Sequence, residues 1–418
     1  MCNIVPGEAV AVGPSRTIQR LSELQLPGNL EIHPLAYPGQ HETPEEDPFR
    51  NVWIAHATEL PIGEEIRAVS HLAAALGGAV FAGEAVADVN TYLPFATVPT
   101  AKRRDLEMSP PAQSWADNVR GLVERILESK EVNSLLLPRR TPIALVDSGV
   151  DPEALLSGRR IDQFDYSEDE TVRKVARGRS VDTCGHGTRV ARVLDACLPK
   201  KVDLVSAKLG NANADVTALR VARTYADVVS RTSPAVVNLS LAPVDDSLVC
   251  PGCGETCPIP PICSQVLPFV FRLAGATTIT VMAAGNSGQR GNSRFVSVDT
   301  RTLVLASALD STGKRASYSS AVGDGVITAH AFGGDNKDVP DGVTMFKNQP
   351  EAYGTSFAAP FVSAAIYPVV LAKRLKGESI AADTVFGPNH HRSGRGWLPD
   401  WFHDREYLGV VARPSRWW

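Results

Sequence analysis

The chain has 418 residues, of which 44% are hydrophobic and 21% charged, the proportions of an ordinary globular protein. Its formal net charge of -4 gives no reason to expect nucleic acid or an anionic membrane surface as a partner. No run of 18 or more apolar residues is present, and the first 20 residues lack the basic start and apolar core of a secretory signal, so we expect a cytoplasmic protein with no membrane span.

The first third of the chain predicts a small α+β region. Residues 1 to about 50 are expected to be irregular, because prolines and acidic residues interrupt any periodic pattern. Residues 52–57 are typical of a strand, residues 61–78 of a helix that ends in glycines, and residues 79–89 again of a strand.

A second helix is expected from about Ser114. Its apolar residues fall on one helical face, which indicates a packing surface. They are Trp115, Val119, Leu122, Val123, Ile126 and Leu127.

From Thr141 onward, short apolar strands alternate with helical stretches. The expected strands are 142–149, 202–209, 235–242, 277–285 and 302–309. The expected helices are 186–197, 214–231, 265–276 and 356–375. Continuous apolar strands that alternate with helices predict an α/β fold with a doubly wound, mostly parallel sheet. In such a sheet the active site forms at the carboxyl ends of the strands.

Three polar residues stand at such positions. Asp147 ends an apolar strand in ALVDSGVD, and His186 opens a helix in DTCGHGTRVARVL. Ser356 opens another helix in YGTSFAAPFVSAA. A nucleophilic serine requires a base within hydrogen-bond reach and a carboxylate that fixes the tautomer of that base.

These segments resemble the signature blocks of the subtilase family, D-[ST]-G, H-G-T-x-V-A and G-T-S-x-A-x-P, in the order Asp, His, Ser that is typical of subtilisin. MAAGNSG is similar to the oxyanion segment of the family and places Asn286 in that role. STGKRASYSSAVGDGV is similar to the stretch between the oxyanion and nucleophile blocks. The resemblance covers about residues 141–375.

The resemblance implies a serine endopeptidase that cleaves protein or peptide substrates through Asp147, His186 and Ser356. Asn286 would donate its side-chain amide to the oxyanion, and catalysis would need no cofactor. Calcium sites are common in the family, but no acidic cluster in this sequence can be assigned to one.

VVNLSLAP resembles the strand of the family that pairs with an extended substrate, so Ser240, Leu241 and Ala242 are the expected substrate-binding residues. Ala242 stands where the family usually has glycine. Arg189 and Arg192, after the H-G-T block, stand where the family usually has histidine and glycine.

Four of the seven cysteines lie in a predicted insertion at residues 243–264. Three states fit them: a structural zinc site, two local disulfides, or reduced cysteines without a ligand. The C-P-G-C-G part resembles a metal knuckle, whereas the second half lacks a paired C-x2-C. The candidate ligands are Cys250, Cys253, Cys257 and Cys263.

We therefore predict an N-terminal region at 1–138, a catalytic domain at 139–376 and a C-terminal extension at 377–418. The N-terminal region is interpreted as an inhibitory pro-region, a docking domain for a regulatory protein, or a permanent structural part. The alternative to an enzyme is a subtilase-like scaffold protein without catalytic turnover. The complete set of catalytic residues argues against this alternative.

Overall fold

The computed structural model describes most of the chain between residues 4 and 385. The described residues are 4–37, 47–93, 106–129, 132, 141–167, 172–176, 178–179, 181–210, 216–241, 266–286, 288, 301–320, 327–336, 338–378, 380–382 and 385. Ala242, the four clustered cysteines and most of the predicted C-terminal extension lie outside them.

An eight-stranded sheet forms the centre of the molecule, with the strand order β13-β12-β11-β10-β5-β8-β6-β7. Its strands from β13 to β6 pair in parallel, and the edge strand β7 pairs antiparallel with β6. In chain order the strands are β5 (Ile143–Asp147), β6 (Ile161–Asp165), β7 (Arg173–Lys174), β8 (Leu204–Lys208), β10 (Val236–Leu239), β11 (Ile279–Ala283), β12 (Leu303–Leu309) and β13 (Ile327–Phe332). The predicted doubly wound, mostly parallel α/β fold is confirmed.

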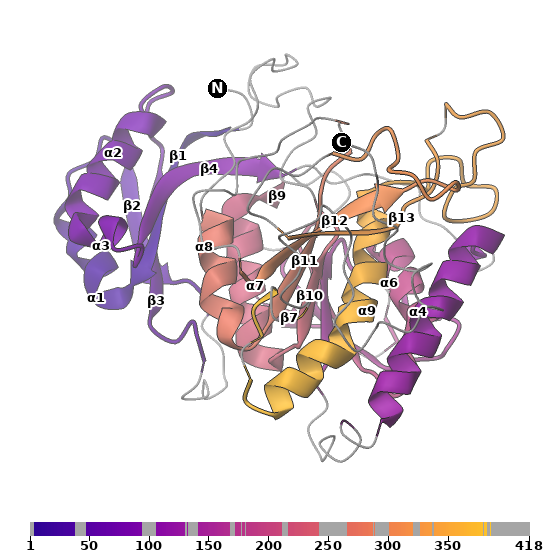
Figure 1. The fold of residues 1–418 in the computed structure, drawn as a ribbon. Coiled ribbons are helices and arrows are strands. Elements are labelled where there is room, and N and C mark those ends of the chain that lie inside the picture. Colours follow the sequence, from indigo (N-terminus) through magenta and orange to yellow (C-terminus); the bar gives the residue numbers. More distant parts are fainter. Residues whose placement is uncertain are drawn as a thin grey trace.

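Helices cover both faces of this sheet (Figure 1). On one face lie α4 (Pro110–Glu128), α6 (His186–Cys197) and α9 (Thr355–Leu375), and on the other lie α7 (Ala218–Thr232) and α8 (Val266–Leu273). Short 3-10 turns, η3 (Pro152–Ala154) and η4 (Ala274–Ala276), complete the connections. Along β5, Ile143 and Leu145 enter the first core and Ala144 and Val146 the second, which explains a strand without polar alternation.

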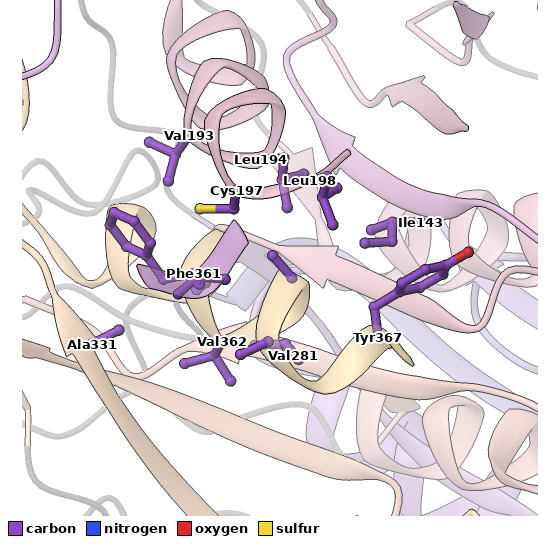
Figure 2. Close-up of a cluster of buried hydrophobic side chains, with 14 of the residues drawn as sticks. Ile143, Val193, Leu194, Cys197, Leu198, Val281, Ala331, Phe361, Val362 and Tyr367 are labelled. Atoms are coloured by element: carbon purple, nitrogen blue, oxygen red, sulfur yellow. The ribbon is translucent and has the colours of Figure 1, made fainter. Parts of the chain in front are cut away.

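Helix α9 is the central helix of the first core. Figure 2 shows its Phe361, Val362 and Tyr367 packed with Ile143 of β5 and Cys197 of α6. Its length and composition would suit a membrane span, but 94% of its most apolar stretch is buried inside the protein. It is therefore a core helix.

The N-terminal region contains a second sheet of five strands, in the order β2-β3-β1-β4-β9. Its elements are β1 (Ile4–Pro14), α1 (Ser15–Ile18), η1 (Gln19–Glu23), β2 (Asn29–Pro34), β3 (Val52–Thr58), α2 (Glu65–Leu76), α3 (Gly78–Phe81) and β4 (Val86–Leu93), and β9 (Val216–Thr217) is added from the segment before α7. Figure 1 shows this sheet beside α7 and α8.

Two sequence-based expectations for this region were wrong. Residues 4–34 are not irregular, because β1 is an inner strand between β3 and β4. Both of its faces are covered, Val10 by one core and Ala9 by another, so the polar alternation of a half-buried strand is missing. The strand expected at 79–89 begins only at Val86, because a short helix, α3, precedes it.

Helix α4 belongs to the packing of the large sheet. Its predicted start at Ser114 is four residues late, since prolines at the first helical positions, Pro110 and Pro111, open the helix. Val119, Val123 and Leu127 enter the core that also contains α6 and α9. The domain boundary at residue 138 stays a prediction, but the packing groups α4 with the helices that follow that boundary.

Candidate active site

The four predicted catalytic residues come from four elements at one edge of the large sheet. Asp147 is the last residue of β5, and His186 is the first residue of α6. Ser356 is the second residue of α9, and Asn286 follows the end of β11. Parallel strands present their carboxyl ends at the same edge, which brings these distant parts of the chain to one place.

Asp147 and His186 form a buried hydrogen-bonded pair. Nδ1 of His186 lies 2.8 Å from Oδ1 of Asp147, and the two residues are 2% and 0% exposed. An Nδ1–H that donates to the carboxylate leaves Nε2 as the basic nitrogen of the ring. Burial lowers the pKa of His186, but the carboxylates of Asp147 and Asp182 outweigh it, so the net pKa lies above the ordinary histidine value.

Asp182, which the sequence analysis did not single out, organises the turn before α6. Its Oδ1 accepts the backbone N–H of Gly185 at 2.7 Å, and its Oδ2 accepts that of Thr188 at 2.8 Å. The hydroxyl of Ser148 donates to Oδ1 at 2.9 Å and accepts from the Gly187 N–H at 2.9 Å. The usual capping position, directly before the helix, is occupied by Gly185, so no local signal in the sequence identifies Asp182.

Glycines let these two segments approach each other. Gly185 has a φ of 78°, a conformation that side chains with a Cβ rarely adopt. A Cβ on Gly187 would lie 2.2 Å from the carbonyl oxygen of Gly149. Close backbone contact thus explains the second glycine of G-H-G, whereas Gly149 of D-S-G is explained by its own φ of 102°.

Ser356 is hydrogen-bonded to the predicted substrate strand. Its hydroxyl donates to the carbonyl oxygen of Ser240 at 3.0 Å, and the hydroxyl of Ser240 donates to the carbonyl oxygen of Ser356 at 2.7 Å. Leu241 is buried in the core beneath α7 and α8, so its side chain does not line a substrate site. The structure therefore places Ser240 beside Ser356, whereas Ala242 lies outside the described residues.

Asn286 is held against the segment that opens α9. Its Oδ1 accepts the backbone N–H of Thr355 at 2.9 Å and the Thr355 hydroxyl at 2.9 Å. A Cβ on Gly354 would lie 3.1 Å from Nδ2 of Asn286. Two bonds to Oδ1 fix the amide plane, so the donor Nδ2 faces the start of the helix that carries Ser356.

The predicted cysteine site, Cys250, Cys253, Cys257 and Cys263, lies outside the described residues. Within the described part of the chain, no group of three or more His, Cys, Asp or Glu residues could hold a metal ion. Zinc bound by the four cysteines stays a prediction.

The model of the subtilase family, Peptidase_S8, matches residues 139–374. No curated protein sequence matches the chain. A variant of the epidermin leader peptide processing serine protease of Staphylococcus aureus is structurally similar, with a TM-score of 0.50, 15% identity and coverage of 89% of this chain and 92% of that chain. At this identity the similarity supports the fold alone.

Two further solved structures align less closely. The nisin leader peptidase NisP of Lactococcus lactis has a TM-score of 0.41 and 18% identity, over 64% of this chain and 86% of that chain. A cold adapted subtilisin-like serine proteinase has a TM-score of 0.41 and 19% identity, over 62% of this chain and 84% of that chain.

Proposed function

This chain belongs to the subtilase family and is a serine endopeptidase, and from that premise we propose that Asp147, His186 and Ser356 are its catalytic triad. Asn286 is the side-chain donor of its oxyanion hole. The observation that supports this assignment most strongly is the buried 2.8 Å bond between Asp147 and His186, at the sheet edge where α9 begins with Ser356.

In this mechanism Oγ of Ser356 attacks the carbonyl carbon of the scissile peptide bond while its proton passes to Nε2 of His186. The carbonyl electrons move onto the oxygen, which accepts hydrogen bonds from Nδ2 of Asn286 and from backbone N–H groups at the start of α9. The imidazolium returns the proton to the leaving amine, and water then hydrolyses the acyl-enzyme by the same steps. Asp147 keeps the ring oriented and stabilises its positive charge.

The substrate is a protein or peptide bound in extended form. Support comes from Ser240, whose carbonyl oxygen already accepts a hydrogen bond from Ser356 and therefore faces the reacting hydroxyl. A substrate strand that pairs with the backbone after β10 would bring its scissile bond to Ser356.

A fluorophosphonate probe tests the assignment, because it phosphonylates an activated serine without requiring a known substrate. We expect labelling of the wild-type chain at Ser356, no labelling of Ser356→Ala, and strongly reduced labelling of His186→Ala. Equal labelling of wild type and Ser356→Ala would refute the assignment.

We also propose that the N-terminal region controls the enzyme. Strand β4 pairs with β9, so that Leu93 lies opposite Val216, and the side chain of Asn90 accepts the Leu219 N–H at the start of α7. Phe49 also stacks edge-on against Tyr225 of α7, with ring centres 6.3 Å apart. The region is thus bound to β9 and α7, which lie within the residues that match the subtilase family.

Insertion of a specific protease site within residues 94–105 tests this control. We expect fluorophosphonate labelling to rise at least tenfold when the site is cut and the N-terminal fragment is removed. An unchanged labelling rate after removal would argue for a permanent structural role.

A further inference from the structure

Arg189 is a buried cation one helical turn beyond His186. It is 2% exposed and is the largest of the fully buried side chains among the described residues. Its Nη1 donates to the carbonyl oxygen of Gly185 at 3.1 Å, at the start of its own helix. Because a buried guanidinium is costly unless its donors are bonded, the positions of its acceptors are significant.

Two further partners of Arg189 belong to the loop that leads to Ser356. Nε of Arg189 donates to Oε1 of Gln349 at 2.8 Å, and Gln349 is itself 7% exposed. Nη2 lies 4.0 Å from Oε1 of Glu351, a looser ion pair. One side chain therefore links the first turn of α6 to the segment just before α9.

This loop is fixed by backbone hydrogen bonds up to two residues before Ser356. The Ala352 N–H donates to the carbonyl oxygen of Gln349 at 3.0 Å, and the Met345 N–H donates to that of Ala352 at 2.7 Å. The Gly354 N–H donates to Gly333 at 2.9 Å and ends the loop two residues before Ser356. A shift of Gln349 would thus disturb Ala352, to which it is hydrogen-bonded, and through it the short stretch of chain from Ala352 to Ser356.

We propose that Arg189 is a positioning residue that holds α6, the helix of His186, in a fixed position relative to the loop that leads to Ser356. This proposal rests on the triad assignment made above. The planar fork of arginine matters here, because it bonds the Gly185 carbonyl and Gln349 at once, which the single ammonium of lysine does not reproduce.

The charge of Arg189 also acts on the pKa of His186, which an apolar residue that only packs in the core would not do. The charged groups that act on His186 are Asp147 of β5, Asp182 in the turn before α6, and Arg189 on α6. Burial and Arg189 lower the pKa of His186, whereas the two carboxylates raise it. Removal of the arginine charge should therefore raise this pKa. The acid limb, which is the fall in labelling rate at low pH caused by protonation of His186, should then lie at higher pH.

The test compares Arg189→Met, Arg189→Lys and Gln349→Leu in the full chain. Arg192→Met is the matched control, because Arg192 lies on the same helix, is 4% exposed and influences the pKa of Cys197 near the far end of that helix. The readouts are the fluorophosphonate labelling rate from pH 5 to 9, the urea midpoint, and amide hydrogen exchange at Ala352 and Gly354.

Arg189→Met should label about 10²-fold more slowly, with its acid limb at higher pH, because a small misplacement of the base costs about that much. Arg189→Lys and Gln349→Leu should lose rate with an unchanged acid limb, since the positive charge remains. In these three variants the amides of Ala352 and Gly354 should exchange faster, whereas in Arg192→Met labelling rate, acid limb and exchange should stay near wild type.

Full labelling of Arg189→Lys, or an equal loss in Arg192→Met, would overturn the proposal and leave only a general packing role. Wild-type chain that is not labelled at Ser356 would instead count against the triad assignment. In that case hydrogen exchange still decides the coupling between Arg189 and the loop, because it does not depend on catalysis.

Discussion

Replacement of Asn286 by aspartate should separate catalysis from folding at the oxyanion site. Aspartate is nearly isosteric and keeps an oxygen that accepts from the Thr355 N–H and hydroxyl, both at 2.9 Å in the wild type. It replaces the donor Nδ2 by a second oxygen, so the developing oxyanion loses a hydrogen bond and gains a repulsive charge. Asn286→Leu removes the same donor and also leaves both Thr355 groups without this acceptor.

Loss of one oxyanion-hole donor costs about 10²–10³-fold in kcat, or about 2.7–4 kcal/mol. We expect Asn286→Leu to lose that much and Asn286→Asp to lose at least as much. Unsatisfied Thr355 donors should cost Asn286→Leu about 1–3 kcal/mol of unfolding free energy, whereas Asn286→Asp should unfold close to wild type at pH 8.

The measurements are kcat and KM on a cleavable peptide from a library screen and urea unfolding of each variant. The unfolding data serve as the control for a general loss of structure. A kcat within threefold of wild type in Asn286→Asp would refute the reasoning, because the side chain would then not be the donor.

Three further predictions concern Asp147, Gly187 and His330. Asp147→Asn should lower kcat about 10⁴-fold through loss of the correct His186 tautomer, and because the carboxylate raises the His186 pKa, the acid limb of the residual activity should move to lower pH. Gly187→Ala should destabilise the fold by about 1–3 kcal/mol in urea unfolding, since its Cβ would lie 2.2 Å from the carbonyl oxygen of Gly149; an unchanged midpoint would contradict this geometry. Burial lowers the pKa of His330 to about 4. As the pH falls, the unfolded state therefore binds a proton before the folded state does. The free energy of unfolding should drop by about 2 kcal/mol between pH 7 and pH 5. His330→Leu should remove that part of the drop, and an identical pH dependence in the variant would show that this histidine is not responsible.

The residues proposed for the site could be selected from the sequence because they lie in short local segments, and the structure brings these segments to one edge of the sheet. Asp147, His186 and Ser356 each lie within two residues of a glycine that the local backbone requires, such as Gly185 with its φ of 78°. The apolar strands between them also predicted a parallel sheet, since both faces of β5 are covered.

The N-terminal sheet was harder to predict, because its central strand carries no periodic signal. Val10 and Ala9 of β1 face two different cores, so the strand has no solvent face. Pairing of β4 with β9 joins segments more than a hundred residues apart, and no local pattern specifies such a contact.

The sequence by itself identified the four segments that we propose carry the nucleophile, the base, the carboxylate and the oxyanion donor, because each of these functions needs a particular residue type beside a particular turn. Only the tertiary structure decided what surrounds them. Asp182 caps α6 beside Ser148, and Arg189 joins that helix to Gln349, since these contacts depend on how separate elements pack. The sequence specifies the chemical type of each side chain, whereas the fold determines its partners, because it brings distant segments together.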